Sequence, residues 1–388
     1  MIIKPSNQGN ASVFGSASVF SSPPPSSSTA FSFGNPASIK TPTSNFGSSS
    51  TTPYQTTNQL FAMGNAIYNS VFSTSFADKE RALNYFKQAA SLGHIEAQCK
   101  VGDLCREGYG TAQDFAQAIE WYTKAAANGN TLAHLNLGVL CEEGKGRLRN
   151  DYKGAYIHYL QAAERDNSEA IFRLGHLYHY GMGVQANLTQ ARTYYERAAK
   201  QGHVLGSFNA GYMYQFGLGA QPTSLFAFSA IDYGKAFGYY MQAAKENHPD
   251  ALCNVGYLYE KGYGVILNYK QAFHHYSRGA EKGSYQAHQN LGELYMDGRG
   301  TNTDLDKAYH HFETAHQGGI EESQKYMDII KEKKSDISGS GSMNGDYIAI
   351  AEHNRLIKEK DDKIAAFMEQ IKLQQTQIDS LMGKLFST

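Results

Sequence analysis

Between residues 58 and 334 the apolar positions follow a helical period. In the stretches "SEAIFRLGHLYHYGMG" (168–183) and "PDALCNVGYLYEKGYG" (249–264), apolar residues recur three and four positions apart, which places them on one face of a helix. A second helical pattern follows each such stretch and opens with an Asp or Asn, at Asp78, Asp114, Asp151, Asn187, Asp232, Asn268 and Asp304. These residues are strong N-caps because their side-chain oxygen accepts a free backbone N–H. The pattern predicts pairs of helices, one pair after another.

The same signals return at a nearly constant interval. A Gly-x-Gly pair ends each first helix, at Gly108/Gly110, Gly144/Gly146, Gly181/Gly183, Gly217/Gly219, Gly262/Gly264 and Gly298/Gly300. Two small residues near the end of each second helix recur at intervals of 36 or 37 residues, with one interval of 45. A period in this range indicates a solenoid with one supersecondary unit per period. Because the motif recurs, Gly108-Tyr109-Gly110 is not interpreted as a phosphate-binding loop.

Each first helix also carries an internal glycine, at Gly102, Gly138, Gly175, Gly211, Gly256 and Gly292. Glycine costs about 1 kcal/mol relative to alanine inside a helix, so its recurrence predicts that a neighbouring helix approaches closely. In the second helix an alanine stands four residues after the cap, and aromatic residues such as Tyr194-Tyr195 precede the small pair. Small residues against large ones predict two interlocking helices.

These motifs together resemble a known repeat. The pattern A-x-x-x-L-G-x-L-Y-x-x-G-x-G, followed by D-Y-x-x-A-x-x-x-Y-x-x-A-A-x-x-G, is clearest at 168–203 and 249–284 and is similar to Sel1-like repeats, relatives of the tetratricopeptide family. The resemblance covers residues 58–334 in about seven copies. The copy at 58–94 lacks Gly-x-Gly, and "EESQKYMDIIKEKK" (321–334) is interpreted as a closing cap helix. The resemblance implies an all-α solenoid that acts as an adaptor between proteins, without catalytic activity or a cofactor.

One position in the first helices is a candidate for partner binding. Two residues before each internal glycine stand Lys100, Asn136, Arg173, Asn209, Asn254 and Asn290. Asn is a mediocre helix former, but its amide donates and accepts at once and so suits the backbone of an extended peptide, as in relatives that bind peptides. The alternative is that these amides only bond a neighbouring hairpin.

The interval of 45 residues points to an insertion around "QPTSLFAFSA" (221–230). Insertions in solenoids map to loops on one face, often the binding face. The apolar Phe226 and Phe228 either form a docking element or fold back onto the solenoid.

The remaining candidates for chemistry are interpreted as structural. The pairs His274-His275 and His310-His311 share one repeat position, which favours packing or surface roles over a metal site. The cysteines also occupy recurring positions and are interpreted as core thiols: Cys99, Cys105, Cys141 and Cys253. No HExxH, GxSxG or Walker motif occurs. We therefore expect neither an enzyme nor a metal or cofactor site.

Composition sets the expected environment. The chain has 35 basic and 36 acidic residues and a net charge of −1, so nothing favours nucleic acid as a partner. No apolar run approaches a membrane span, and "MIIKPSNQGN" lacks the apolar core of a secretory signal. Cysteines without CxxC spacing indicate reduced thiols. We expect a cytoplasmic protein, and the alternative is a nuclear or nuclear-envelope-associated location.

The first 57 residues differ in composition from the repeats. They are rich in Ser, Thr, Pro, Asn and Phe, and their only charged residues are Lys4 and Lys40, which predicts disorder. Three Phe-Gly pairs, starting at Phe14, Phe33 and Phe46, resemble the Phe-Gly tracts of nucleoporins, which implies weak multivalent contacts. The alternative is a Ser/Phe-rich tail with chance Phe-Gly pairs.

The last residues predict a dimerisation helix. After a linker at 335–346, residues 347–388 carry apolar residues at a strict spacing of seven: Ile350, Ile357, Ile364, Ile371, Ile378 and Leu385. This is a coiled-coil seam, and β-branched residues at one seam position favour a parallel dimer. The alternative is a helix that docks on its own solenoid.

Together these observations predict a non-enzymatic adaptor or scaffold. Protein partners would bind the solenoid at 58–334, and two chains would associate through 347–388. The alternative function is a nuclear-pore or nuclear-transport-associated protein that acts through its Phe-Gly segment.

Overall fold

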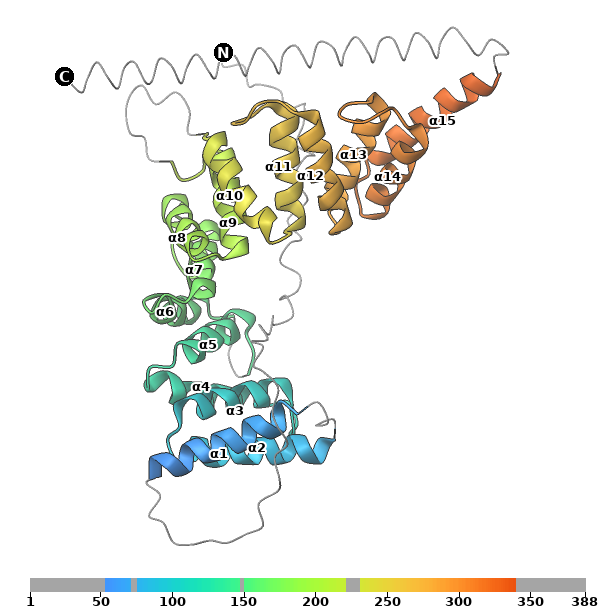
Figure 1. Ribbon diagram of the computed structural model, residues 1–388. Helices are drawn as coiled ribbons and strands as arrows, with labels where there is room; N and C mark the ends of the chain where they lie inside the picture. Colours follow the sequence, from blue (N-terminus) through green and yellow to red (C-terminus); the bar gives the residue numbers. More distant parts are fainter. Residues whose placement is uncertain (1–52, 71–74, 147–149, 221–230, 340–388) are drawn as a thin grey trace, which may run out of the picture. The chain divides into compact units, whose positions relative to one another are not determined.

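The computed structural model describes residues 53–70, 75–146, 150–220 and 231–339, and these residues form fifteen helices and no strand (Figure 1). The predicted all-α fold is thereby confirmed. The chain divides into two compact units, residues 1–150 and 151–388. Each unit is a series of antiparallel helix pairs, in which each helix packs against the next.

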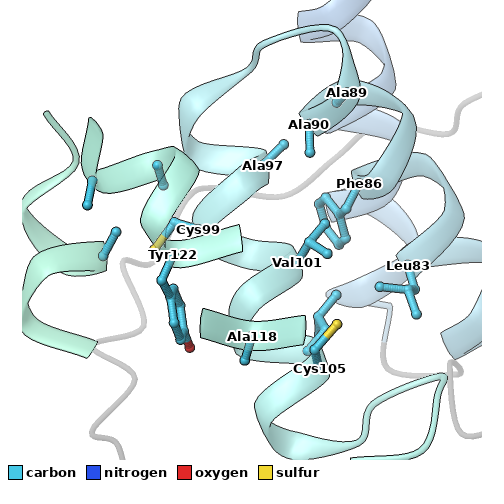
Figure 2. Packing of buried hydrophobic residues seen from close by; sticks show 14 of the residues in the cluster. Leu83, Phe86, Ala89, Ala90, Ala97, Cys99, Val101, Cys105, Ala118 and Tyr122 are labelled. Carbon is cyan, nitrogen blue, oxygen red and sulfur yellow. The ribbon is translucent and has the colours of Figure 1, made fainter. Parts of the chain in front are cut away.

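The first unit contains five helices: α1 (Pro53–Tyr68), α2 (Phe76–Ser91), α3 (Ile95–Glu107), α4 (Phe115–Ala127) and α5 (Thr131–Glu143). Its core is formed by the facing sides of α2, α3 and α4 together with α5. Figure 2 shows Phe86, Val101, Cys105, Ala118 and Tyr122 packed in this core.

The second unit contains ten helices: α6 (Tyr152–Ala163), α7 (Ser168–Tyr180), α8 (Leu188–Lys200), α9 (Val204–Gln215), α10 (Tyr233–Lys245), α11 (Pro249–Lys261), α12 (Tyr269–Glu281), α13 (Tyr285–Asp297), α14 (Leu305–Gln317) and α15 (Ser323–Gly339). The helices α7 to α14 form four hairpins. The last helix, α15, packs on α14 with Met327 and Ile330 buried and with Tyr326 stacked on Phe312 at 4.8 Å. It therefore covers the last hairpin, as predicted for a closing helix.

The predicted N-caps are found at the second helix of six hairpins. Asp114, for example, accepts a hydrogen bond from the Gln117 backbone N–H at 2.9 Å. The prediction that Asp78 caps the first of these helices is wrong. Ser75 caps α2 instead, with its hydroxyl 3.1 Å from the Asp78 N–H, so Asp78 lies within the first turn. Asp78 lies four residues before Ala82, the same spacing that separates the cap from the alanine in the other repeats. The sequence therefore predicted a helix start about one turn after the actual one.

The internal glycines are sites of close helix approach, as predicted. A Cβ at Gly102 would lie 2.6 Å from the ring of Tyr122, and one at Gly175 would lie 2.8 Å from Tyr195. The corresponding rings of the second helices are fully buried: Phe86, Tyr122, Tyr159, Tyr195, Tyr240, Tyr276 and Phe312. Each ring takes the space that a side chain on the first helix would need, and the hairpin interlocks at this point.

The second glycine of five Gly-x-Gly pairs lies against backbone of the preceding hairpin, whereas Gly146 lies against the side chain of Ile119. At Gly183, with φ of 71°, a Cβ would lie 2.4 Å from the carbonyl carbon of Tyr152. Only glycine combines this positive φ with so close an approach. The motif is therefore an element of repeat stacking.

The core thiols are confirmed, since all four cysteines are buried and none of them forms a disulfide. Burial raises the pKa of the Cys99 thiol to about 12.

The ends of the repeat region differ from the predicted boundaries at 58 and 334, because α1 begins at Pro53 and α15 ends at Gly339. Several predictions fall on residues outside the described ones. These are the Phe-Gly pairs at Phe14, Phe33 and Phe46, the insertion with Phe226 and Phe228, and the heptad positions from Ile350 to Leu385.

Candidate protein-binding face

In the first unit, the residues two positions before the internal glycines contact their neighbours. The Lys100 ammonium lies 3.8 Å from the centre of the Tyr68 ring. Asn136 on α5 donates from Nδ2 to Oδ1 of Asp103 on α3 at 3.0 Å. Asp103 also accepts the hydroxyl of Tyr122 at 2.8 Å. Asn136 thus links two successive first helices.

In the second unit the equivalent residues vary in burial and in partner. Arg173 donates from Nε to Glu169 at 2.7 Å. Asn209 is half-buried and donates to the Leu205 carbonyl of its own helix at 2.8 Å. Asn254 is only 7% exposed and lies beside Tyr240, whose hydroxyl donates to Oε1 of Gln215 at 2.7 Å. Asn290 donates to the Cys253 sulfur on the preceding first helix at 3.5 Å.

The contact to a neighbouring hairpin, which was the alternative for these amides, is therefore present at Asn136 and Asn290. Peptide binding by the row stays a prediction. Among the amides of the second unit, Asn209 donates to a carbonyl of its own helix. This hydrogen bond does not join two hairpins.

Next to this row lies a surface that sequence reasoning missed. Tyr180, Tyr212, Phe216, Tyr257 and Tyr263 lie on or directly after the first helices α7, α9 and α11, and we call them the aromatic face. Tyr180, Phe216 and Tyr263 are 54%, 38% and 39% exposed. Tyr212 and Tyr257 are half-buried among them. Three consecutive hairpins thus present large aromatic rings to solvent.

The rings of the aromatic face are neighbours in space. The ring centres of Tyr212 and Phe216 are 4.7 Å apart, and those of Tyr257 and Tyr263 are 6.2 Å apart. Tyr180 and Tyr212 are close enough that Tyr212 adds to the effect of burial in raising the pKa of Tyr180. The His176 ring lies 4.6 Å from that of Tyr180 and extends the face along α7.

Four of the five aromatic residues occupy two fixed repeat positions: Tyr212 and Tyr257 lie three residues after the amide row, and Tyr180 and Phe216 lie seven after it, whereas Tyr263 lies nine after Asn254. In α3 the same positions hold Asp103 and Glu107, and in α13 they hold Glu293 and Asp297. The signal was therefore readable as a change from acidic to aromatic residues at equivalent positions. Sequence reasoning missed it because Tyr is also the common core residue of this repeat.

The charged groups beside the aromatic face are already paired. Lys261 lies 2.7 Å from Glu260, which is buried and also accepts the hydroxyl of Tyr276 at 2.8 Å and Arg299 at 3.1 Å. Burial alone would raise the pKa of Glu260, but the Lys261 and Arg299 charges and these hydrogen bonds bring it below its usual value. At the other end, Arg173 pairs with Glu169. The face is thus effectively neutral.

Comparison with known proteins places this arrangement in a family. The model of the Sel1 repeat matches residues 60–94, 95–130, 131–167, 168–203, 205–248, 249–284 and 286–319. The chain belongs to the Sel1 repeat family. Its described residues fold as an α-solenoid of these repeats, and the aromatic face belongs to the three Sel1 repeats between 168 and 284.

Two solved structures are similar to this chain, and the first of them shows the same fold. A Sel1 repeat protein from Oxalobacter formigenes is 24% identical and aligns over 71% of this chain and 76% of its own, with a TM-score of 0.58. The protective antigen c5321 of uropathogenic Escherichia coli is 22% identical over 82% of this chain and 84% of its own, with a TM-score of 0.43. No curated protein sequence matches the chain.

The first Sel1 repeat, which lacks Gly-x-Gly, keeps the internal glycine. A Cβ at Gly64 would lie 2.7 Å from the buried ring of Phe86, as in the other hairpins. The family match at 60–94 follows this packing position.

The histidine pairs of the last Sel1 repeats serve packing. His275 stacks on Tyr259 with ring centres 5.7 Å apart, and His311 stacks on Tyr295 at 5.6 Å. Burial lowers the pKa of each to about 4, so both are neutral near pH 7. Across the described ranges, no three His, Cys, Asp or Glu side chains gather as metal ligands would. Over the same ranges, no helix has the length and apolar character needed to cross a membrane.

Proposed function

We propose that this Sel1 repeat protein is a scaffold without catalytic activity of its own, and that its aromatic face binds an extended segment of a partner protein. Sel1 repeat proteins generally act as scaffolds for protein interactions. The observation that carries the proposal is the exposure of Tyr180, Phe216 and Tyr263 around the half-buried Tyr212 and Tyr257.

The chemistry of the face suits a peptide backbone with apolar side chains. Tyrosine offers a large contact area at low entropic cost, and Tyr is enriched among the residues that dominate binding energy. Asn209 lies three residues before Tyr212, and Asn254 lies three before Tyr257. Residues three apart in a helix share a face. Tyr212 is thus accompanied by the half-buried amide of Asn209, which suits a peptide N–H or carbonyl, whereas Asn254 is only 7% exposed.

The face is also selective in charge. Because Lys261 and Arg173 are already paired with Glu260 and Glu169, a charged partner would have to compete with these ion pairs. A neutral segment with aromatic or aliphatic side chains meets no such competition. The proposal therefore specifies an uncharged, apolar-containing segment.

Association of two chains through residues 347–388 belongs to the same proposal. A dimer would carry two aromatic faces and raise the avidity for a partner with two binding segments. The nuclear-transport alternative rests on Phe-Gly pairs outside the described residues, and no observation on the described residues favours it.

A peptide selection tests the proposal. Random peptides displayed on phage are selected on the full chain, and the selected peptides are titrated against the chain and two variants. The double variant Tyr180→Ser, Phe216→Ser removes the exposed centre of the face. The matched control is Ile157→Ser, because Ile157 is 59% exposed on α6 and lies outside the face.

We expect the double variant to weaken binding at least tenfold, because each exposed aromatic anchor typically contributes more than 1 kcal/mol. The control should bind as the parent chain does. Equal affinity for the parent and the double variant, with an unchanged helical circular-dichroism spectrum, would contradict the proposal.

A further inference from the structure

The chain carries a segment whose chemistry matches the aromatic face. Residues 1–52 contain no acidic residue, and their only charges are Lys4 and Lys40. The segment holds five phenylalanines: Phe14, Phe20, Phe31, Phe33 and Phe46. Around them stand Ser, Thr, Pro, Ala and Asn. Apart from these two lysines the segment is uncharged, and it offers aromatic side chains along its length.

The face is complementary to this composition. Its exposed rings belong to Tyr180, Phe216 and Tyr263, and the charges beside it are satisfied within the repeats. Aromatic side chains gain from pairing with other rings, in offset or edge-to-face geometry, beyond the area they bury. A segment without acidic residues also brings no carboxylate that would compete with Glu260 for Lys261.

The attachment point allows the contact. The segment ends at Pro53, where α1 begins. Fifty-two residues span up to about 170 Å when extended, so the tether does not restrict the segment to the repeats beside Pro53. Covalent attachment at Pro53 also keeps the local concentration of the segment at about a millimolar or somewhat below. An intrinsic dissociation constant of the same size is then enough to fill half of the faces.

We propose that residues 1–52 occupy the aromatic face of their own chain, through Phe31 and Phe33 and their neighbours, and so compete with outside partners. This inference rests on the proposed function, because it names an occupant of the same face. Its consequence is an autoinhibited scaffold. A partner must displace the segment, and only segments that bind more tightly than the tethered one are retained.

Site-directed photo-crosslinking tests the contact in the full chain. The four native cysteines are buried, so a cysteine introduced as Ala30→Cys can be labelled selectively with a benzophenone maleimide. After irradiation, we expect cross-linked peptides from 176–180, 212–216 or 257–263 in the single-chain product. The matched control carries the same label together with Phe31→Ser and Phe33→Ser, and it should lose most of these cross-links.

Three outcomes would overturn the inference. The cross-links could fall elsewhere on the repeats, they could be unaffected by the loss of Phe31 and Phe33, or they could join only two different chains. The last result would place the segment on a second copy.

A competition measurement separates this inference from the proposed function. A face-binding peptide is titrated against the full chain and against a variant with all five phenylalanines changed to Ser. Removal of the internal competitor should tighten binding about twofold or more, the factor expected when half of the faces or more are occupied. If the affinity is unchanged while Tyr180→Ser, Phe216→Ser still weakens it, the inference is wrong and the proposed function stands. If the face variant has no effect either, the proposed function is wrong as well.

Discussion

Gly256 on α11 lies directly against the buried ring of Tyr276 on α12, and a Cβ at Gly256 would lie 2.6 Å from that ring. Real side chains do not approach so closely, so the ring or the helix must move if any other residue stands there. The same relationship recurs at Gly102, Gly175 and Gly211 with their own tyrosines. This glycine–tyrosine contact holds the two helices of a repeat at a fixed distance.

Gly256→Ala should destabilise the protein although alanine is the better helix former. The helical preference gains about 1 kcal/mol, but overpacking a tight core costs about 1 to 3 kcal/mol, and the ring of Tyr276 has no exposed space to enter. We expect a net loss of about 1 kcal/mol or more, measured as a lower midpoint of thermal unfolding.

Gly238→Ala is the matched control, because Gly238 lies within α10 and a Cβ there meets no atom within 4 Å. This variant should be stabilised by about 0.5 to 1 kcal/mol. Equal effects of the two substitutions would show that the ring contact does not decide the stability.

Asn247 supplies a second test, at a turn between repeats. It has a positive φ of 59°, where the other repeats have glycine, as at Gly202 with φ of 80°, except for Asp166 with φ of 56°. Its Oδ1 accepts Arg278 from the next repeat at 3.0 Å. Asn tolerates this backbone region better than alanine does.

Asn247→Ala should therefore strain the backbone at this positive φ and remove the contact with Arg278. We expect the free energy of unfolding to fall by about 1 to 2 kcal/mol. Asn247→Gly loses only the contact and should stay within about 1 kcal/mol of the parent. Urea unfolding of the two variants measures the difference, and an alanine variant as stable as the glycine variant would contradict it.

Buried histidines should make the repeats sensitive to acid. Burial, with smaller effects from His274 and Arg278, lowers the pKa of His275 to about 4, against about 6.5 in an unfolded chain. Between these values the unfolded chain binds a proton that the folded chain does not. The contribution of His275 is thus fully present above pH 6.5 and is lost as the pH falls towards 4.

Other repeats have tyrosine at the position equivalent to His275, as at Tyr194 and Tyr239, and His275→Tyr introduces the same residue here. From pH 7.5 to pH 5, the parent should lose about 1 to 2 kcal/mol more stability than this variant. Denaturant unfolding at the two pH values provides the comparison. An equal loss in both proteins would mean that His275 does not contribute to the acid sensitivity.

Most of the fold followed from the period of the sequence. The internal glycines, the Asp and Asn caps and the alanine pairs each have one physical reason, and that reason is local to a hairpin. The Asp78 cap was misplaced because α2 begins one turn earlier than its counterparts and uses Ser75. The position of a residue within the repeat predicts which helix face it packs on. The residue at which the helix begins depends instead on which side chain caps it.

The candidate site was less predictable. The amide row was found from its recurrence, but its partners differ from repeat to repeat, from the Leu205 carbonyl to the Cys253 sulfur. The aromatic face was missed because exposure does not follow from residue type. Tyr276 is fully buried and Tyr180 is 54% exposed, and only the position of each residue in the repeat separates the two.

The heptads of residues 347–388 predict a parallel dimer. One charged substitution in the seam should dissociate its two chains. Ile364 lies near the middle of the seam of isoleucines, and Ile364→Asp would place a charge at a core position of the coiled coil. Analytical ultracentrifugation should show a dimer for the parent and a monomer for this variant. Lys363→Asp, a neighbouring substitution outside the seam, should leave the dimer intact. A parent chain that sediments as a monomer at tens of micromolar would contradict the prediction.

The amide row can be divided experimentally into binding and structural members. Asn254 is buried beside Tyr240, so Asn254→Ala should lower the unfolding midpoint by several degrees. Asn209 is half-buried and bonds only the Leu205 carbonyl among its side-chain contacts, so Asn209→Ala should change the midpoint little.

If Asn209 also bonds the backbone of a bound segment, Asn209→Ala should weaken the binding of a face-binding peptide about five- to tenfold, the effect of one lost hydrogen bond. Calorimetric titration alongside thermal unfolding separates the two effects. A variant with unchanged affinity would restrict binding to the aromatic rings.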